Sequence, residues 1–255
     1  MSLLTVSGVN KAFGGLKALS EVSLTVETGD IYGVIGPNGA GKTTLFNALT
    51  GLYSIDSGTI TLAGERIDGR PPHAVLKRGL ARTFQNIRLF GEMTALENVL
   101  VGRHARTRSG VFGAVLKLAA TRREEAESLA RAHALLERVG IARHAGRMAR
   151  HLSYGDQRRL EIARALASEP TLLALDEPAA GMNPGERTAL VGLLRQLRDD
   201  GLTLLLIEHD VKLVMGLCSR LAVLDYGQRI FEGVPDAASR DPRVVAAYLG
   251  DEDAA

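Results

Sequence analysis

The residues most clearly suited to chemistry are Gly36-Pro37-Asn38-Gly39-Ala40-Gly41-Lys42-Thr43-Thr44. This stretch fits the pattern G-x-x-x-x-G-K-[ST] of phosphate-binding loops. An apolar run before it, 31–35, predicts a buried strand, and the run 44–49 predicts the start of a helix. Glycines allow consecutive amide N–H groups to turn toward an anion, and the helix N-terminus adds a partial positive charge. A glycine-rich turn that binds nothing is the alternative, but the flanking elements favour a nucleotide site.

Two residues of this loop have side chains suited to a nucleotide bound to a metal ion. Lys42 supplies a mobile cation for the β- and γ-phosphates. The hydroxyl of Thr43 suits a ligand of Mg²⁺, which prefers oxygen donors.

A second chemical group follows a continuous apolar run from Thr171 to Leu175. Buried parallel strands have this composition, and ligands bind beyond their carboxyl ends. Of the two acids that follow, Asp176 is suited to hold Mg²⁺ through water, and Glu177 is suited to accept a proton from an attacking water. Two solvated acids in a turn are the alternative.

Two further strands are expected to end at the same edge of the sheet. The run 202–207 predicts a buried strand that leads into His209, and the run 80–84 predicts a strand that ends at Gln85. His209 could be a plain surface residue, but the convergence with Asp176 favours a functional one. The remaining histidines lack the spacing of metal ligands, and we assign them no role.

A polar segment, Ser153-Tyr154-Gly155-Asp156, precedes a helix expected from Arg158 to about Ser168. Ser153 and Gly155 would place a hydroxyl and free N–H groups at the positive end of that helix. Taken alone, Ser-x-Gly before a helix is usually an N-cap and is weak evidence for an anion site.

The elements that must position these residues are short strands and helices. Alternating runs at 3–7 and 22–26 predict half-buried strands, with a loop at 10–15 that carries Phe13. Phe13 either stacks on a base or belongs to the core. The remaining expected elements are a strand at 58–63, a short helix at 72–78, a helix capped by Asn183 with Pro184 in its first position, a hairpin of 220–224 and 228–232, and a last helix that starts at Asp241-Pro242 and ends near 249. Residues 251–255 are expected to fray.

Between Asn86 and about Ala149 strand patterns vanish, which predicts a helical insertion. Residues 122–139 predict an amphipathic helix with an apolar face of Ala126, Leu129, His133, Leu136 and Val139. The basic runs 103–108 and 122–123 are most simply solvated faces, although they could lie near anionic lipid head groups.

The composition excludes several other classes of protein. The net charge is +2, aromatic residues make up 4% and there is no Trp, which argues against a nucleic-acid-binding surface. A single cysteine, Cys218, excludes an internal disulfide. We expect no signal peptide at the Met1 end and no membrane-spanning helix, because no apolar run reaches the ~20 residues needed.

Taken together, these motifs resemble the nucleotide-binding subunit of ATP-binding cassette (ABC) transporters over nearly the whole chain. The ordered set is the phosphate loop, Gln85, Leu152-Ser153-Tyr154-Gly155, Asp176-Glu177 and His209. Three longer segments, 82–90, 154–164 and 206–210, resemble more specifically the ATP-binding subunit of branched-chain amino acid importers. That subunit is usually paired with a second, different ATPase.

This resemblance implies roles for the matching residues. Phe13 would stack on adenine, and Gln85 would sense Mg²⁺ and the membrane subunit. Ser153 and Gly155 would bind the γ-phosphate held by the other ATPase chain, within a signature that also contains Tyr154 and Asp156. His209 would contact the γ-phosphate. The implied site is therefore catalytic at Glu177, His209 and Gln85, with Mg²⁺ held at Thr43, Gln85 and Asp176. Nucleotide contacts would come from Phe13, Gly36, Asn38, Gly39, Ala40, Gly41, Lys42, Thr43 and Thr44.

The resemblance also implies a fold and partners. The fold is α/β, a P-loop NTPase of the RecA-like type, whose mixed sheet is flanked by helices, with an N-terminal antiparallel β subdomain and an inserted helical subdomain. We expect the ATP-binding core at 1–85 and 160–235, the helical subdomain at 86–159, and a C-terminal helix and tail at 236–255. The cofactors would be ATP and Mg²⁺. Partners would be a second ABC ATPase chain, homologous or identical, docked head to tail, transmembrane permease subunits and, indirectly, a periplasmic solute-binding protein, with no nucleic acid. The chain would lie on the cytoplasmic face of the inner membrane.

Two motifs depart from the general ABC pattern. Tyr154 and Asp156 stand where the signature Leu-Ser-Gly-Gly-Gln has Gly and Gln, and Asn183 stands where Asp is usual; both variants are familiar in the amino acid importer branch. Urea or amide importers, and lipid or lipopolysaccharide transporters, are alternatives with the same ATP chemistry. A non-transport ABC ATPase would need tandem cassettes or long coiled coils, and a small-molecule kinase would lack the signature segment.

Overall fold

The computed structural model describes residues 1–104 and 119–249, which divide into two compact units. The first comprises Met1–Arg82, Thr171–Pro178 and Leu194–Ala255, and the second comprises Thr83–Pro170 and Ala179–Leu193. The domain boundaries expected at 85, 160 and 235 stay predictions.

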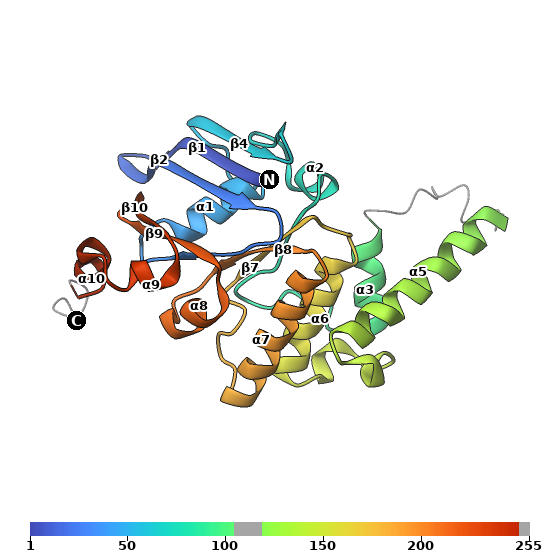
Figure 1. Cartoon of the computed structure of the whole chain (residues 1–255). Coiled ribbons are helices and arrows are strands. Elements are labelled where there is room, and N and C mark those ends of the chain that lie inside the picture. Colours follow the sequence, from blue (N-terminus) through green and yellow to red (C-terminus); the bar gives the residue numbers. More distant parts are fainter. Residues whose placement is uncertain (105–118, 250–255) are drawn as a thin grey trace. The chain divides into compact units, whose positions relative to one another are not determined.

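The first unit contains two sheets (Figure 1). The antiparallel sheet has the order β2-β1-β4-β5, and the mixed sheet has the order β10-β9-β3-β8-β7-β6. Strands β6, β7, β8, β3 and β9 are parallel neighbours, and β10 is antiparallel to β9. The strands are β1 Ser2–Phe13, β2 Leu16–Glu27, β3 Ile31–Ile35, β4 Ser57–Leu62, β5 Glu65–Arg66, β6 Leu80–Arg82, β7 Leu172–Asp176, β8 Thr203–Ile207, β9 Arg220–Asp225 and β10 Gln228–Gly233. The predicted mixed sheet and antiparallel β subdomain are confirmed.

The core of this unit joins the two sheets through one helix. Helix α1, Lys42–Leu49, contributes Leu45, Phe46 and Leu49 to a buried cluster that also contains residues of both sheets. Strands β3, β7 and β8 are buried along their whole length, as expected of central parallel strands covered on both faces. The other helices confined to this unit are α2 Pro72–Lys77, α8 Val211–Leu217, α9 Pro235–Ala238 and α10 Pro242–Leu249.

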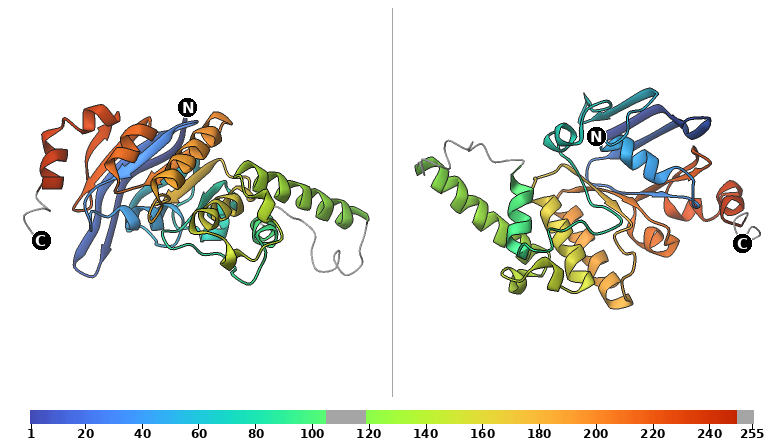
Figure 2. Two further views of the ribbon diagram at one scale, coloured as in Figure 1. Left: turned by 90° about the horizontal axis from the view of Figure 1, so that it is seen from below. Right: turned by 180° about the vertical axis from the view of Figure 1, so that it is seen from behind.

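The second unit is helical. It contains α3 Ala95–Arg103, α5 Ala119–Arg138 and α6 Tyr154–Leu166, with 3₁₀ turns at Ala142–His144 and Ala149–His151. Helix α7, Pro184–Asp199, begins in this unit, and its residues from Leu194 onward belong to the first. Figure 2 shows the C-terminal half of α5 beside α3 and α6, while its N-terminal half extends away from them.

The structure corrects the predicted loop at 10–15, and it extends the strands predicted at 3–7 and 22–26. Strand β1 continues to Phe13 and β2 starts at Leu16, so only Gly14 and Gly15 form the turn. Irregular pairing between Val6 and Val9 broke the alternation on which the prediction relied. The side chain of Asn10 bridges that irregularity, because it donates to the Gly8 carbonyl and to Glu21 Oε1.

The buried face of α5 was also predicted wrongly. Leu136 and Val139 are buried as expected, but Leu129 is exposed, as are Ala126 and His133. Ser128 and Ala132 are buried in their place. Both are small residues, one of them polar, so the apolar pattern alone selected the wrong stripe.

The basic run 103–108 begins with a buried residue rather than a solvated one. Arg103 ends α3, is 8% exposed and forms an ion pair with Glu169 at 2.9 Å. Arg106, Arg108 and Arg122 lie outside the residues whose side chains the structure describes, and so do the predicted frayed residues 251–255.

Candidate nucleotide-binding site

The phosphate loop connects β3 to α1 within the first unit. Gly36 and Gly41 have φ values of 147° and 99°, which L-residues with side chains rarely adopt. A Cβ at Gly36 would lie 2.0 Å from the Leu224 carbonyl oxygen, and one at Gly41 would lie 2.6 Å from that of Ala18. The loop is therefore closely packed against β9 and β2, which explains why glycine is required at both ends.

Lys42 is the first residue of α1, and its side chain turns back into the loop. Its Nζ donates to the carbonyl oxygens of Gly36, at 2.6 Å, and Pro37, at 2.8 Å, and the residue is 8% exposed. Thr43, in contrast, is exposed in the first turn of α1. The cation is thus positioned at the loop, and the neighbouring hydroxyl is open to a ligand.

The predicted acids lie at the carboxyl edge of the same sheet. Asp176 ends β7 beside Ile207, the last residue of β8. Glu177 has a left-handed backbone with φ 45°, and its N–H donates to the Ile207 carbonyl at 3.0 Å. A non-glycine residue in this conformation costs about 1–3 kcal/mol and persists only when its surroundings enforce it. This turn directs successive acids differently, and His209 Nδ1 lies 3.5 Å from Glu177 Oε2.

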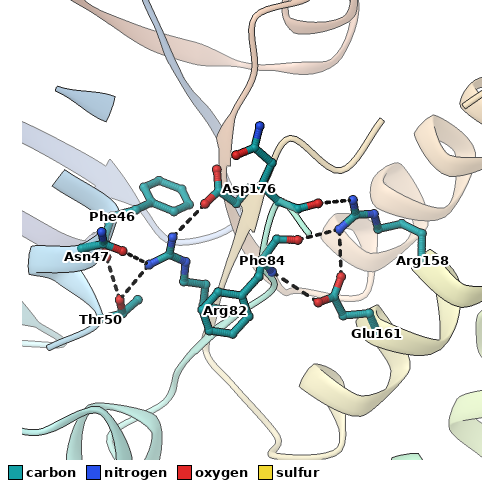
Figure 3. A network of polar contacts seen from close by, with 9 residues as sticks. Phe46, Asn47, Thr50, Arg82, Phe84, Arg158, Glu161 and Asp176 are labelled. Carbon is teal, nitrogen blue, oxygen red and sulfur yellow. Dashed lines mark hydrogen bonds and ion pairs between the residues drawn. The ribbon is translucent and has the colours of Figure 1, made fainter. Parts of the chain in front are cut away.

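Arg82 is a site residue that sequence reasoning missed. Its Nη2 lies 2.7 Å from Asp176 Oδ2, and both side chains are almost fully buried. Its Nη1 donates to Asn47 Oδ1 at 2.6 Å and to Thr50 Oγ1 at 3.2 Å, both at the C-terminal end of α1 (Figure 3). Arg82 therefore ties the strand that carries Asp176 to the helix that begins with Lys42. No local pattern reveals this link, because the partners lie 32 to 94 positions away.

Phe13 lies at the end of β1 with a second aromatic residue beside it. The rings of Phe13 and Tyr53 meet edge to face with centroids 5.2 Å apart, and both residues are about half exposed. Lys11 Nζ lies 5.3 Å from the centroid of Phe13. Tyr53 was not predicted from the sequence, which gave no signal for it.

The C-terminal helix borders the outer face of the phosphate loop. A cavity of about 400 Å³ separates residues of the loop, 37–40, from Arg243, Ala246 and Ala247 of α10. Arg243 forms an ion pair with Asp241 at 2.8 Å, and this pairing lowers the pKa of Asp241 to about 2. The cavity is thus apolar on its helix side, apart from one paired arginine.

The signature segment, which we define as Ser153–Asp156, lies in the second unit. Ser153 is the N-cap of α6, and its Oγ accepts from the Asp156 N–H at 3.2 Å. This cap starts the helix at Tyr154, four residues before the predicted start at Arg158. A Cβ at Gly155 would lie 2.7 Å from Glu186 Oε1 of α7, so a side chain there would require the Glu186 side chain to move.

Gln85 belongs to an irregular segment, residues 83–88, which we call the Gln85 loop. Strand β6 ends at Arg82 rather than at Phe84 as predicted. The reason is that Arg158 and Glu161 of α6 take the backbone groups of Phe84 that would otherwise pair in a sheet. Gln85 itself is exposed.

The structure thus brings the phosphate loop, Asp176, Glu177 and His209 to one sheet edge of the first unit, and Gln85 and the signature segment together in the second. Among residues 1–104 and 119–249, no three His, Cys, Asp or Glu side chains gather as a preformed metal cluster. Thr43 and Asp176 offer oxygen donors only, which suits Mg²⁺ because that ion uses few protein ligands besides water and substrate phosphate.

Comparison with known proteins agrees with this geometry. The family model of ABC transporters matches residues 19–180, and the model of branched-chain amino acid ATP-binding cassette transporters matches residues 228–254. The high-affinity branched-chain amino acid transport ATP-binding protein LivG of Salmonella typhimurium is 49% identical over 250 residues, which are 98% of each chain.

Solved structures give the same result. An ATP-binding cassette of an ABC transporter in its ADP conformation is 35% identical, with a TM-score of 0.86 over 98% of this chain and 99% of that chain. A dimeric ATP-binding cassette in a post-hydrolysis state, bound to ADP and phosphate, is 26% identical, with a TM-score of 0.75 over 91% of this chain and 99% of that one. The predicted P-loop NTPase fold is confirmed, and the chain belongs to the ATP-binding cassettes of the ABC transporter family.

Proposed function

We propose that this chain is the ATP-hydrolysing subunit of an importer for branched-chain amino acids. The observation that carries the ATPase assignment is the common sheet edge that holds the phosphate loop, Asp176 and the Glu177–His209 contact at 3.5 Å. The solute assignment is supported by the likeness to LivG over 98% of both chains.

ATP would bind with its phosphates inside the loop formed by Gly36, Asn38, Gly39, Ala40 and Gly41, at the N-terminus of α1. Lys42 would exchange its two carbonyl acceptors for phosphate oxygens, which form stronger, charge-assisted hydrogen bonds. Thr43 and Thr44 would add hydroxyls in the first turn. Phe13, with Tyr53 beside it, offers an exposed aromatic surface for the adenine ring.

Glu177 and His209 would carry out the chemical step. Glu177 would take a proton from a water molecule as the water oxygen forms a bond to the γ-phosphorus. The bond from that phosphorus to the bridging oxygen of ADP breaks, so the products are ADP and phosphate. His209 would donate a hydrogen bond to the γ-phosphate, and its contact with Glu177 would keep both groups at the reacting centre.

Mg²⁺ fits the oxygen donors of Thr43 and Asp176, and the family likeness adds Gln85. The ion would neutralise charge on the phosphate oxygens. The ion pair from Arg82 fixes one oxygen of Asp176, so this chain presents a carboxylate of fixed orientation at the metal site.

The partners follow from what one chain lacks. Ser153 and Gly155 would bind the γ-phosphate held by a second ATPase chain, docked head to tail. Tyr154 and Asp156 complete the signature segment that acts across the dimer. The dimeric relative bound to ADP and phosphate supports the pairing of two such chains. No described helix is long and apolar enough to span a bilayer, so transmembrane permease subunits would supply the pathway. A periplasmic binding protein would deliver the solute, and this chain would lie on the cytoplasmic face.

Transport by the assembled complex tests this proposal. The tagged chain would be purified from membranes with the subunits that accompany it and reconstituted in liposomes that contain Mg²⁺ and ATP. We expect uptake of radiolabelled leucine with the solute-binding protein outside, and none with the Lys42→Ala complex. Urea serves as the control solute. ATP-dependent uptake of urea without uptake of leucine would contradict the solute assignment, and leucine uptake by the Lys42→Ala complex would contradict the role of this chain.

A further inference from the structure

A buried ion pair in the second unit has no role in the proposed chemistry. Arg158 and Glu161, one turn apart on α6, are 0% and 1% exposed, and Arg158 Nη1 lies 2.8 Å from Glu161 Oε2. Burial raises the pKa of the Glu161 carboxyl, although Arg158 beside it acts in the opposite direction. Such pairs contribute little net stability, because desolvation offsets their attraction, and apolar residues of similar size often stabilise a fold as well or better. The pair therefore calls for an explanation other than stability.

Four further hydrogen bonds of the pair go to the backbone of the Gln85 loop. Arg158 donates to the carbonyl oxygens of Phe84, at 2.7 Å, and Gln85, at 2.8 Å. Glu161 Oε1 accepts from the N–H groups of Phe84, at 3.3 Å, and Arg88, at 3.4 Å. Figure 3 shows the side chains of Arg158 and Glu161 next to each other, beside the backbone of Phe84. The pair thus fixes both polar backbone groups of Phe84, together with the Gln85 carbonyl and the Arg88 N–H that follow it.

The planar guanidinium is suited to this task. Its N–H groups form a rigid fork that can hold two carbonyl oxygens at once, whereas a lysine ammonium is a point charge on a flexible stem. The same arginine also reaches Tyr154 Oη, at 3.4 Å, in the first turn of α6. One side chain therefore links the signature segment, the second turn of α6 and the Gln85 loop.

We propose that Arg158 and Glu161 are positioning residues that make the Gln85 loop and the signature segment move as one body. The inference rests on the proposed function, in which Ser153 contacts ATP in the neighbouring chain and Gln85 serves the site of its own chain. We call the hydrogen bonds of Arg158 and Glu161 to the Gln85 loop the tether. The nucleotide of the neighbouring chain sets the position of α6, and the tether transmits that position to Gln85, which contacts the nucleotide site of its own chain. Without it, the fold and ATP binding persist, but Gln85 loses its fixed position.

The test uses a pair of substitutions that keeps the core apolar. Arg158→Met/Glu161→Leu removes both charges together and leaves no unpaired ion. Arg158→Lys keeps the charge beside Glu161 but removes the fork, and it is the second variant if the first does not fold. The matched control is Arg103→Met, which removes an arginine ion pair of the same unit that does not touch the Gln85 loop; Glu169, its partner, is about half exposed and stays solvated.

The first readout does not depend on activity. In hydrogen–deuterium exchange of the full chain, the amides of Phe84 and Arg88 should exchange at least about 10-fold faster in Arg158→Met/Glu161→Leu than in the parent. The reason is that local opening sets the protection of these amides. Arg158→Lys should show a smaller increase, and Arg103→Met none in this segment. Unchanged exchange at 83–88 in both Arg158 variants would overturn the proposal.

The second readout separates positioning from folding. In the assembled complex, kcat for Mg²⁺-ATP hydrolysis should fall on the order of 10- to 100-fold, since small displacements of an aligned group have effects of that size. KM for ATP and the melting temperature should stay near the parent values. Faster exchange with unchanged kcat would overturn the positioning role. A parent complex with no ATPase activity would instead refute the proposed function, while the exchange data would still decide whether the tether exists.

Discussion

Replacing Arg82 with methionine should destabilise the first unit strongly, because it leaves Asp176 as a buried, unpaired carboxylate. The two side chains are 7% and 6% exposed, and the charged atoms lie 2.7 Å apart. At an effective dielectric constant of about 20, the attraction of such a pair is about 4–6 kcal/mol, most of which offsets the desolvation of the two ions. Methionine removes the attraction and leaves the desolvation of Asp176 in place. The expected loss in the free energy of unfolding is therefore about 3–5 kcal/mol.

Thermal unfolding of the nucleotide-free chain measures this loss. A change of that size lowers the melting temperature by about 6–20 °C, at about 2–4 °C per kcal/mol for a chain of this size. Asp176→Asn in the same chain removes the unpaired charge of the carboxylate. The double variant Arg82→Met/Asp176→Asn should therefore recover most of the lost free energy of unfolding. The hydrogen bonds of Arg82 to Asn47 and Thr50 would remain broken, so recovery should be incomplete.

Two results would refute this reasoning. The ion pair would not be the cause if Arg82→Met melted within about 2 °C of the parent, less than 1 kcal/mol at the scale used above. Equal melting temperatures for the single and the double variant would show that the unpaired carboxylate is not what destabilises the chain.

Three further predictions address the loop, the single cysteine and the buried pair of α6. Lys42→Ala should abolish ATP binding in calorimetric titration while the circular dichroism spectrum stays unchanged; parent-like binding would show that the loop does not hold phosphate. Burial raises the pKa of the Cys218 thiol to about 12, so the native chain should resist a thiol reagent at pH 8 and react only on addition of urea; rapid labelling without urea would contradict this. Burial also raises the pKa of the Glu161 carboxyl, so at pH values between its unfolded-state and folded-state pKa the folded state holds a proton that the unfolded state has released. Relative to Glu161→Gln, the free energy of unfolding of the parent should therefore decrease as the pH rises from 4.5; a difference that is independent of pH would show that the pKa is not raised.

The parts of the site that were predicted from the sequence depend on neighbours in the chain. The phosphate loop requires its glycines, Lys42 and the flanking strand and helix within one short stretch. Asp176 and His209 were located because each follows a buried apolar strand, and parallel strands end at a common edge. Asn183 was correctly expected as a cap, since its Oδ1 accepts from the Glu186 N–H at 2.9 Å.

The parts that were missed depend on contacts distant in sequence. The end of β6 is set by Arg158 and Glu161, more than 70 positions further along. One signal for these residues was present: they fall on the buried stripe of α6 that includes Gly155, Ile162 and Leu166, where a charged pair is unusual. For Arg82 and Tyr53 the chain offers no comparable pattern, because their partners are brought together only by the fold.

The association of two ATPase chains around ATP tests the central claim most directly. Glu177→Gln keeps the shape of the side chain but removes the proton acceptor, so hydrolysis should fall by roughly 10²–10⁴-fold while ATP still binds. With Mg²⁺-ATP, size-exclusion chromatography of this variant, alone or with its partner ATPase, should show a dimer that disappears without nucleotide. Adding Ser153→Arg to the same chain should abolish the dimer, because the larger side chain occupies the place of the neighbour's γ-phosphate. An ATP-dependent dimer that survives Ser153→Arg would contradict the account, because the signature segment would then not act across the dimer.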